Sequence, residues 1–258
     1  MKFGLIGHPI AHSLSPALFK AGYNGRYPYE LIETADFEEA YQRFLDDYNG
    51  INVTAPFKEL AYAKADIISD ECRLIGATNL LIKTPEGVTA YNSDYRGLLL
   101  WLQDLIQTKQ PSEITVLIAG LGGAGKAAAV AAWKAGLKVT LMNRDISKSE
   151  YMADRLGTGV SVRPLTDFTE CFNEADIIIY NLPVRLPEID MLGTDNKGSR
   201  KHLLEANYKN PSFDRQTLDR LGNIEYHSGL TWLLLQALTG YELFTGEKPD
   251  LSQMTKQI

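Results

Sequence analysis

The stretch that decides the fold is Ile114–Arg144, ITVLIAGLGGAGKAAAVAAWKAGLKVTLMNR. Its first apolar run, 114–119, is short and β-branched, which is typical of a buried parallel strand. The alanine-rich segment that follows predicts a helix ending at Gly136, and a second strand is expected at 138–142. Between the first strand and the helix, glycines occur in the order G-x-G-x-x-G, at Gly120, Gly122 and Gly125.

Each glycine would have a structural role in a dinucleotide-binding β-α-β unit. One permits a tight turn, the next lets the backbone approach a pyrophosphate, and the third lets helix and strand pack closely. The helix starting near Ala124 directs its N–H groups and partial positive charge at that phosphate. The alternative is a glycine-rich turn in another doubly wound protein. The candidate cofactor loop consists of Gly120, Gly122, Gly123, Ala124 and Gly125.

The end of the second strand indicates which dinucleotide is bound. An NAD site usually has Asp or Glu there, whereas this strand ends in Asn143-Arg144. The guanidinium of Arg144 suits a 2′-phosphate, and Lys148 adds charge. Asp145 is the competing feature, because its carboxylate favours NAD. We therefore expect the cofactor to be NADP (NADPH), with Asn143, Arg144 and Lys148 in its site.

The composition excludes several classes of protein. The 258 residues are 45% hydrophobic and carry a formal net charge of −6, which supports a globular core and argues against a nucleic-acid or membrane-surface binder. No apolar run reaches the roughly 18 residues that span a bilayer, and the N-terminus lacks a signal-peptide pattern. Cys72 and Cys171 are too few for a disulfide framework. We expect a cytoplasmic protein with reduced thiols.

The histidines do not predict a metal centre. They have neither HExxH spacing nor CxxC partners, so we expect no metal. The four positions are His8, His12, His202 and His227.

Several polar residues stand at expected helix starts. Ser13 and Ser15 precede a helix expected from Ala17, where hydroxyls can hold a carboxylate or simply cap the helix. Lys58 lies in a first helical turn, which the helix dipole disfavours, so it is either functional or an ordinary surface lysine. Asp94 begins another helix and could be no more than a capping acid. Gln236, inside an apolar helix, is more often a satisfied core amide than a ligand.

With these pieces in order, the chain resembles the shikimate dehydrogenase family over nearly its whole length. The glycine loop, Asn143-Arg144 and Gln236-Ala237 all match the family. The other matching stretches are Gly7-His8-Pro9-Ile10 with His12-Ser13-Leu14-Ser15-Pro16, Asn52-Val53-Thr54-Ala55-Pro56-Phe57-Lys58, Ile75-Gly76-Ala77-Thr78-Asn79 and Asn92-Ser93-Asp94-Tyr95-Arg96-Gly97.

The resemblance implies an α/β protein of two domains. An N-terminal α/β substrate domain is completed by the C-terminal helices, 1–107 plus 229–258. A Rossmann NADP-binding domain, 108–228, is inserted between these parts; its strands and helices alternate from 114 to 226, as in a parallel sheet.

The resemblance also implies the reaction, an NADPH-dependent reduction of 3-dehydroshikimate to shikimate in aromatic amino-acid biosynthesis. Lys58 and Asp94 match the catalytic pair. The implied substrate-binding residues are Ser13, Ser15, Thr54, Asn79, Tyr208 and Gln236. We add Gly229, at the start of the last apolar helix, to the cofactor site.

Departures from the family keep two alternatives open. One is a quinate/shikimate dehydrogenase paralogue that uses NAD, indicated by Asp145. The other is a catalytically silent dinucleotide-binding sensor, indicated by Trp232, where the family usually has methionine, and by the altered loop after Asn181. The retained Lys58 and Asp94 speak against a sensor. For partners we expect a small carboxylate substrate, no nucleic acid and no membrane, in a monomer or homodimer.

Overall fold

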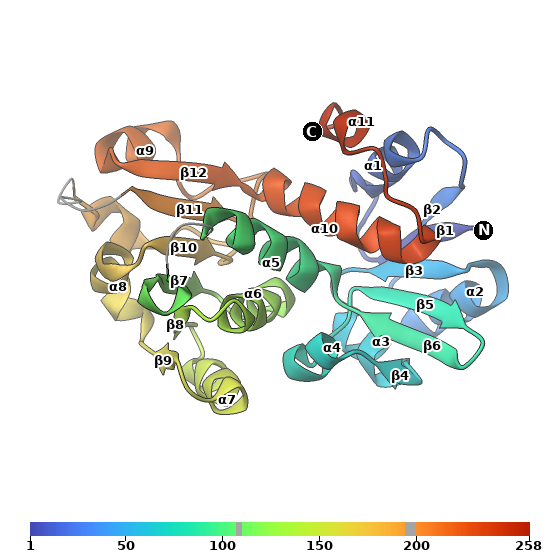
Figure 1. Ribbon diagram of the computed structural model, residues 1–258, viewed down its shortest axis with the longest axis horizontal. Helices are drawn as coiled ribbons and strands as arrows, with labels where there is room; N and C mark the ends of the chain where they lie inside the picture. The colour runs from blue at the N-terminus through green and yellow to red at the C-terminus, as the bar shows by residue number, and fades with distance from the viewer. Residues whose placement is uncertain (107–109, 194–199) are drawn as a thin grey trace. The chain divides into compact units, whose positions relative to one another are not determined.

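The computed structural model describes residues 1–106, 110–193 and 200–258, and the chain divides into two compact units (Figure 1). Unit 1 is Met1–Gly97 with Leu233–Ile258, and unit 2 is Leu98–Trp232. The division falls inside two helices, α5 (Ser93–Leu105) and α10 (Gly229–Thr245). The predicted domain boundary at 107/108 lies outside the described residues, and the one at 228/229 stays a prediction.

Unit 1 is built on a mixed sheet. Its strand order is β2-β1-β3-β5-β6-β4. Strands β1, β2 and β3 are parallel, and β5 is antiparallel to both β3 and β6. The strand bounds are β1 Phe3–Gly7, β2 Tyr29–Glu33, β3 Gly50–Val53, β4 Ile67–Ile68, β5 Leu80–Thr84 and β6 Gly87–Tyr91.

Helices cover both faces of this sheet. On one face Phe44, Ala61 and Cys72 pack with buried strand residues. On the other face Tyr241 and Met254 pack with residues of β1 and β5. Each fully buried large apolar side chain contributes roughly 1.5–3 kcal/mol to folding, so both helical layers are needed. The helix bounds are α1 Ser15–Gly22, α2 Phe37–Asp47, α3 Lys58–Lys64, α4 Asp70–Ile75 and α11 Leu251–Thr255.

Unit 2 is built on a parallel sheet of order β12-β11-β10-β7-β8-β9. All of its strand pairs are parallel, as the sequence pattern predicted. Numbered within the unit from β7, the order is 3-2-1-4-5-6, the doubly wound arrangement of dinucleotide-binding domains. The order reverses between β7 and β10, where such domains bind their ligand. The bounds are β7 Thr115–Ala119, β8 Lys138–Met142, β9 Val160–Val162, β10 Ile177–Tyr180, β11 Lys201–Glu205 and β12 Ile224–Ser228.

The helices of unit 2 differ in how much of each is buried. The residues of α6 from Ala127 to Ala132 are all fully buried, so small side chains let this helix lie close to the sheet. Helices α8 and α9 place Phe172 and Leu221 in a separate core with Tyr180. The bounds are α6 Gly123–Lys134, α7 Ile146–Leu156, α8 Phe168–Glu174 and α9 Arg215–Leu221, with 3₁₀ helices at Pro111–Glu113, Leu165–Asp167 and Pro187–Met191.

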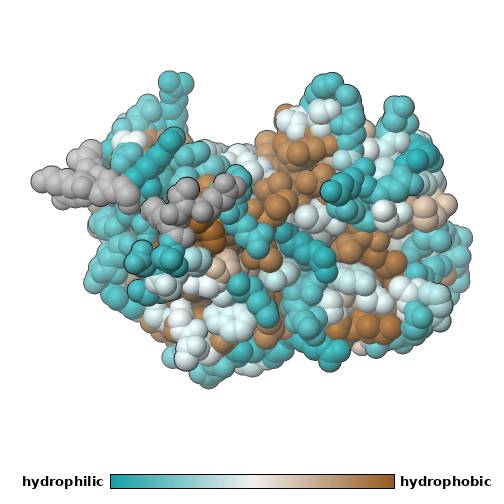
Figure 2. Space-filling model, in the orientation of Figure 1, coloured by the Kyte–Doolittle hydropathy of each residue, from teal (hydrophilic) through white to brown (hydrophobic). Residues whose placement is uncertain are grey.

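The face shown in Figure 2 is mostly hydrophilic, with smaller apolar areas between polar ones. Among the described residues, no helix combines the length and the apolar character needed to cross a membrane. Both cysteines, Cys72 and Cys171, are buried free thiols.

Candidate active site

The candidate substrate residues of unit 1 gather at one edge of its sheet. Strands β1, β3 and β6 end at this edge and β5 begins there, because Asn52 pairs with Leu80 and Leu80 with Tyr91. The loops that leave these strands touch each other. A Cβ built at Gly7 would lie 2.4 Å from Cγ2 of Thr54, and His8 N donates to the carbonyl of Ala55 at 3.2 Å.

Lys58 and Asp94 meet at this edge. Lys58 Nζ donates to Asp94 Oδ2 at 2.6 Å, and the two side chains are 19% and 15% exposed. Lys58 is the first residue of α3 and Asp94 lies in the first turn of α5. The carboxylate therefore offsets the unfavourable position of an ammonium at a helix N-terminus. This charge-assisted bond fixes the ammonium in a partly water-excluded place.

A second group of polar side chains joins three elements. Ser93 N donates to Asn79 Oδ1 at 2.7 Å, and Asn79 Nδ2 donates to Ser93 Oγ at 3.0 Å. The Ser93 hydroxyl donates to Gln236 Oε1 at 3.0 Å. Gln236 Nε2 donates to the carbonyl of Leu233 at 3.0 Å. Ser93 is fully buried, so it sets the orientation of both amides. Sequence reasoning missed it, although it stands between the matched Asn92 and Asp94.

The two serines of the first loop lie at the start of α1. That helix begins at Ser15, two residues before the predicted Ala17. Ser15 N donates to Ser13 Oγ at 3.2 Å, and the Ser13 hydroxyl donates to Ser15 Oγ at 3.2 Å. The buried hydroxyl of Tyr241 donates to the carbonyl of Ser15 at 3.0 Å. Helix α10 therefore holds in place the segment that carries the hydroxyls of Ser13 and Ser15.

The glycine loop of unit 2 has the geometry that its spacing predicts. Gly120 has φ +96°, which only glycine adopts without strain. A Cβ at Gly125 would lie 1.9 Å from the Gly120 carbonyl oxygen, whereas in the described parts of the chain no atom lies within 4 Å of a Cβ at Gly122. The third glycine thus allows close packing, and the second faces open space at the N-terminus of α6. This is the arrangement that accommodates a pyrophosphate.

The residues that follow β8 hold the glycine loop in place and supply exposed positive charges. Leu121 N donates to Asn143 Oδ1 at 3.1 Å, so Asn143 ties the glycine loop to the neighbouring strand. Arg144 and Lys148 are exposed. The carboxylate of Asp145 caps α7 and accepts from Ser147 N and Oγ at 3.2 and 2.6 Å. The Ser147 hydroxyl lowers the pKa of Asp145. The Asp145 carboxylate is therefore already hydrogen-bonded at the start of α7.

Asn181 is a residue that sequence reasoning passed over as a binding group. It follows β10, and its side-chain amide oxygen and nitrogen are both buried without a hydrogen-bond partner among the described residues. A buried amide with no partner costs about 1–3 kcal/mol, so a ligand group at this position is favoured. Its Nδ2 lies 3.6 Å from a Cβ built at Gly125. Asn181 therefore stands beside the glycine loop at the switch point of the sheet.

Tyr208 and Gly229 follow the next strands of unit 2. Burial raises the pKa of Tyr208, so its phenol stays protonated and can donate. Gly229 comes directly after β12, and a Cβ there would lie 2.2 Å from the carbonyl oxygen of Ala206. Only glycine fits where α10 starts against that carbonyl.

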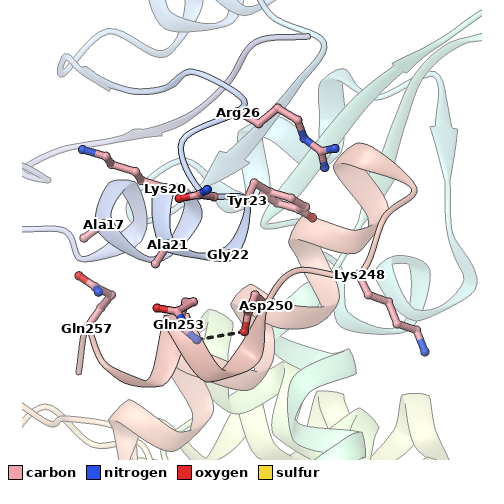
Figure 3. Close-up of a pocket in the computed structure, with 11 residues that line it drawn as sticks. Ala17, Lys20, Ala21, Gly22, Tyr23, Arg26, Lys248, Asp250, Gln253 and Gln257 are labelled. Carbon is pink, nitrogen blue, oxygen red and sulfur yellow. Dashed lines mark hydrogen bonds between the residues drawn. The ribbon is translucent and has the colours of Figure 1, made fainter.

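A pocket elsewhere on unit 1 contains none of the predicted site residues. It lies between α1 and α11 (Figure 3), where Asp250 caps α11 by accepting from Gln253 N at 3.1 Å. Arg26, on its rim, forms an ion pair with Glu247. Desolvation by burial raises the pKa of the lining Tyr23 to about 12. These groups interact with one another, so we assign no ligand to this pocket.

Comparisons with known proteins match both halves of the chain. Residues 5–81 match the family described as the shikimate dehydrogenase substrate binding domain, and residues 104–189 match the family described as shikimate / quinate 5-dehydrogenase. The shikimate dehydrogenase (NADP(+)) of Roseobacter denitrificans is 30% identical, over 98% of this chain and 95% of that protein.

Solved structures give the same result. The shikimate dehydrogenase of Mycobacterium tuberculosis has a TM-score of 0.83 and 30% identity, covering 99% of this chain and 97% of the other. The shikimate 5-dehydrogenase of Thermus thermophilus, in complex with NADP(H) and shikimate, has a TM-score of 0.80 and 28% identity, covering 100% and 98%. The predicted α/β class and the predicted family are confirmed.

Proposed function

The chain belongs to the shikimate dehydrogenase family, and from that premise we propose that it catalyses the reversible, NADPH-dependent reduction of 3-dehydroshikimate to shikimate. It is then an NADP-dependent oxidoreductase that acts on a CH–OH group in aromatic amino-acid biosynthesis. The observation that carries the proposal is the 2.6 Å bond between Lys58 and Asp94, because a ketone reductase needs a positioned proton donor.

The proposed chemistry assigns the proton to Lys58. NADPH, when bound, supplies the hydride that adds to the substrate carbonyl carbon. Negative charge then develops on the carbonyl oxygen, and the Lys58 ammonium stabilises it and donates the proton. Asp94 orients the ammonium through its hydrogen bond. In the reverse direction neutral Lys58 accepts the proton of the alcohol.

The substrate is held by neutral polar groups in this proposal. The hydroxyls of Ser13 and Ser15 hold its carboxylate at the start of α1. Asn79 and Gln236, which Ser93 orients, bind its hydroxyls. Thr54 and Tyr208 complete the proposed set of substrate contacts. Neutral donors bind a carboxylate without adding a second positive charge that would repel the Lys58 ammonium.

The fit of this chain to NADP rests on its own residues. The open space at Gly122 and the N–H groups of α6 suit the pyrophosphate. Arg144 and Lys148 are exposed where a 2′-phosphate is expected, and Asp145 is occupied as a helix cap. We propose that the cofactor-binding residues are Gly120, Gly122, Gly123, Ala124, Gly125, Asn143, Arg144, Lys148 and Gly229, with Asn181 as an addition.

The test is absorbance at the reduced-nicotinamide band, with shikimate or quinate as substrate and NADP⁺ or NAD⁺ as cofactor. We expect turnover with shikimate and NADP⁺. Faster turnover of quinate with NAD⁺ identifies the NAD-dependent quinate/shikimate paralogue. Binding of NADPH without turnover of either acid identifies the catalytically silent sensor.

The expected surroundings are proposals too. We propose a cytoplasmic enzyme that acts as a monomer or homodimer and has no nucleic-acid or membrane partner. The net charge of −6 supports this view, since an acidic surface repels nucleic acid. Measurement of the native mass in solution decides between monomer and dimer.

A further inference from the structure

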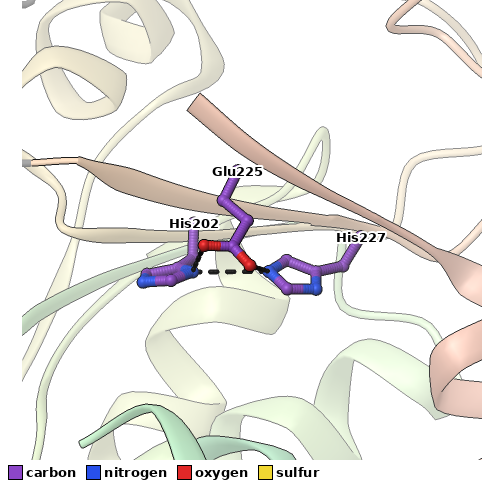
Figure 4. Close-up of side chains that lie close together, drawn as sticks. All are labelled: His202, Glu225 and His227. Carbon is purple, nitrogen blue, oxygen red and sulfur yellow. Dashed lines mark hydrogen bonds and ion pairs between the residues drawn. The ribbon is translucent and has the colours of Figure 1, made fainter. Parts of the chain in front are cut away.

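Three side chains that could ligate a metal lie together on unit 2, in a group that the proposed reaction does not use. They are His202 on β11 and Glu225 and His227 on β12, and Figure 4 shows them on the same side of the two strands. The parallel register pairs His202 directly with Glu225. His227 is two residues further along, so it points to the same face. Sheet register therefore brings together two histidines that are 25 residues apart.

The separations within this group suit a central ion. His202 Nδ1 lies 3.3 Å from His227 Nε2. The carboxylate oxygens of Glu225 lie 3.6 Å from His202 Nδ1 and 3.8 Å from His227 Nε2. Bond lengths of about 2.0–2.2 Å in a tetrahedral zinc site put neighbouring ligand atoms about 3.3–3.5 Å apart. Small side-chain adjustments convert this triangle into one face of such a site.

The two imidazoles are hydrogen-bonded to each other, whereas Glu225 is held only weakly in the cluster. The two separations from Glu225 exceed the usual hydrogen-bond limit of about 3.2 Å, so the carboxylate is near both rings without bonding well to either. Glu225 also forms an ion pair with Arg200 at 3.3 Å. The Arg200 side chain is 65% exposed, and an exposed ion pair contributes little free energy. A divalent cation can therefore displace Arg200 from Glu225.

The three side chains of the group are partly exposed. The side chains of His202, Glu225 and His227 are 24%, 35% and 16% exposed. The ring of Trp101 meets the His227 ring edge to face, with centroids 5.2 Å apart, which fixes that imidazole. Because all three side chains are partly exposed, a water molecule can complete the coordination.

We propose that His202, Glu225 and His227 bind a divalent transition-metal ion of the zinc class, with water in the fourth position. Two imidazoles and one carboxylate suit Zn²⁺ or Co²⁺ and are poor ligands for Mg²⁺ or Ca²⁺. The bound ion joins β11 to the edge strand β12, which leads directly into Gly229 and α10. Because the native register assembles the site, metal binding stabilises unit 2.

The test uses the full chain without a histidine tag. Calorimetric titration with Zn²⁺ is expected to give saturable binding of one ion per chain. Added Co²⁺ is expected to give the strong visible absorbance of a tetrahedral site, and Zn²⁺ is expected to raise Tm. Mg²⁺ at the same concentration should change none of these signals.

Variants locate the site. Glu225→Gln and His202→Asn should each weaken Zn²⁺ binding at least about tenfold, because each removes a direct ligand. The charge-matched control Glu174→Gln and the histidine-matched double control His8→Asn/His12→Asn should retain it. Loss of binding in the double control overturns the proposal. So does the absence of saturable Zn²⁺ binding in the unmodified chain, which needs no variant to fold.

Discussion

Replacing two glycines of the same loop by alanine should have different consequences. At Gly125 the new Cβ meets the Gly120 carbonyl oxygen at 1.9 Å, whereas real Cβ atoms essentially never come within 3.0 Å of another atom. The loop and α6 must therefore separate by at least 1.1 Å, the difference between those two distances. Such overpacking costs roughly 1–3 kcal/mol. Gly125→Ala should lower Tm and also weaken NADPH binding.

At Gly122 the same methyl group meets no atom of the described residues within 4 Å. The backbone there has φ −71° and ψ −171°, which alanine adopts without strain. Alanine as an N-cap costs roughly 0.5–1 kcal/mol more than glycine, and its restriction of the unfolded chain offsets this by about 0.4–1 kcal/mol. Gly122→Ala should therefore leave Tm nearly unchanged. Its methyl occupies the space proposed for the pyrophosphate, so NADPH affinity should fall at least about tenfold, or roughly 1.4 kcal/mol.

The assay pairs thermal unfolding without ligand with a fluorescence titration of NADPH, for both variants and the unmodified chain. We expect the Tm loss in Gly125→Ala alone and the affinity loss in both variants. An unchanged NADPH affinity in Gly122→Ala would refute the placement of the cofactor. An unchanged Tm in Gly125→Ala would refute the close contact between loop and helix.

Four further predictions follow from individual side chains. Lys58→Ala should lower kcat by roughly 10²–10⁴, typical of losing an acid–base group, with little change in NADPH affinity. Arg144→Ala should raise KM for NADPH far more than for NADH, since only NADPH carries the 2′-phosphate. Ser93→Ala should raise KM for the acid substrate and leave NADPH binding unchanged, because the removed hydroxyl orients two amides of unit 1. Burial raises the pKa of Cys72 to about 12 and also raises that of Cys171; at pH 8 a thiol reagent should therefore label neither until the chain is unfolded in urea.

Each of these four predictions can be contradicted by a specific result. Normal turnover in Lys58→Ala refutes its role as proton donor, and equal effects on both cofactors refute the role of Arg144. An unchanged KM in Ser93→Ala shows that the amides hold their orientation without it. Rapid labelling of the native chain shows that a thiol is accessible.

The parts of the fold that were predictable depend on signals between residues close in the chain. The unit from β7 to β8 is such a case, because an apolar run, spaced glycines and a helix occur in immediate succession. By contrast α4, α8 and α9 are only six or seven residues long. Helices of about two turns show too few repeats of the 3.6-residue period for the pattern to be recognised.

The site was predictable only where a pattern or the family resemblance marked its residues. Lys58 and Asp94 each stood at a helix start, but their 2.6 Å contact joins residues 36 positions apart and arises from the sheet edge. Ser93 reads as an ordinary residue at a helix start, and its buried contacts are not visible in the sequence. That the buried Asn181 amide finds no hydrogen-bond partner among the residues the structure describes is a result of packing. His202 and His227 meet only through strand register.

The apolar face that α10 and α11 cover in unit 1 also bears on how the polypeptide is synthesised. Phe3 and Leu80 have been made long before the ribosome reaches Tyr241 and Met254, which pack beside them. In the sequence, unit 2 falls between the two segments of unit 1, so the nascent chain can complete unit 2 first. A premature stop at residue 233 would therefore release a chain that contains the whole of unit 2 together with an aggregation-prone, half-covered sheet in unit 1.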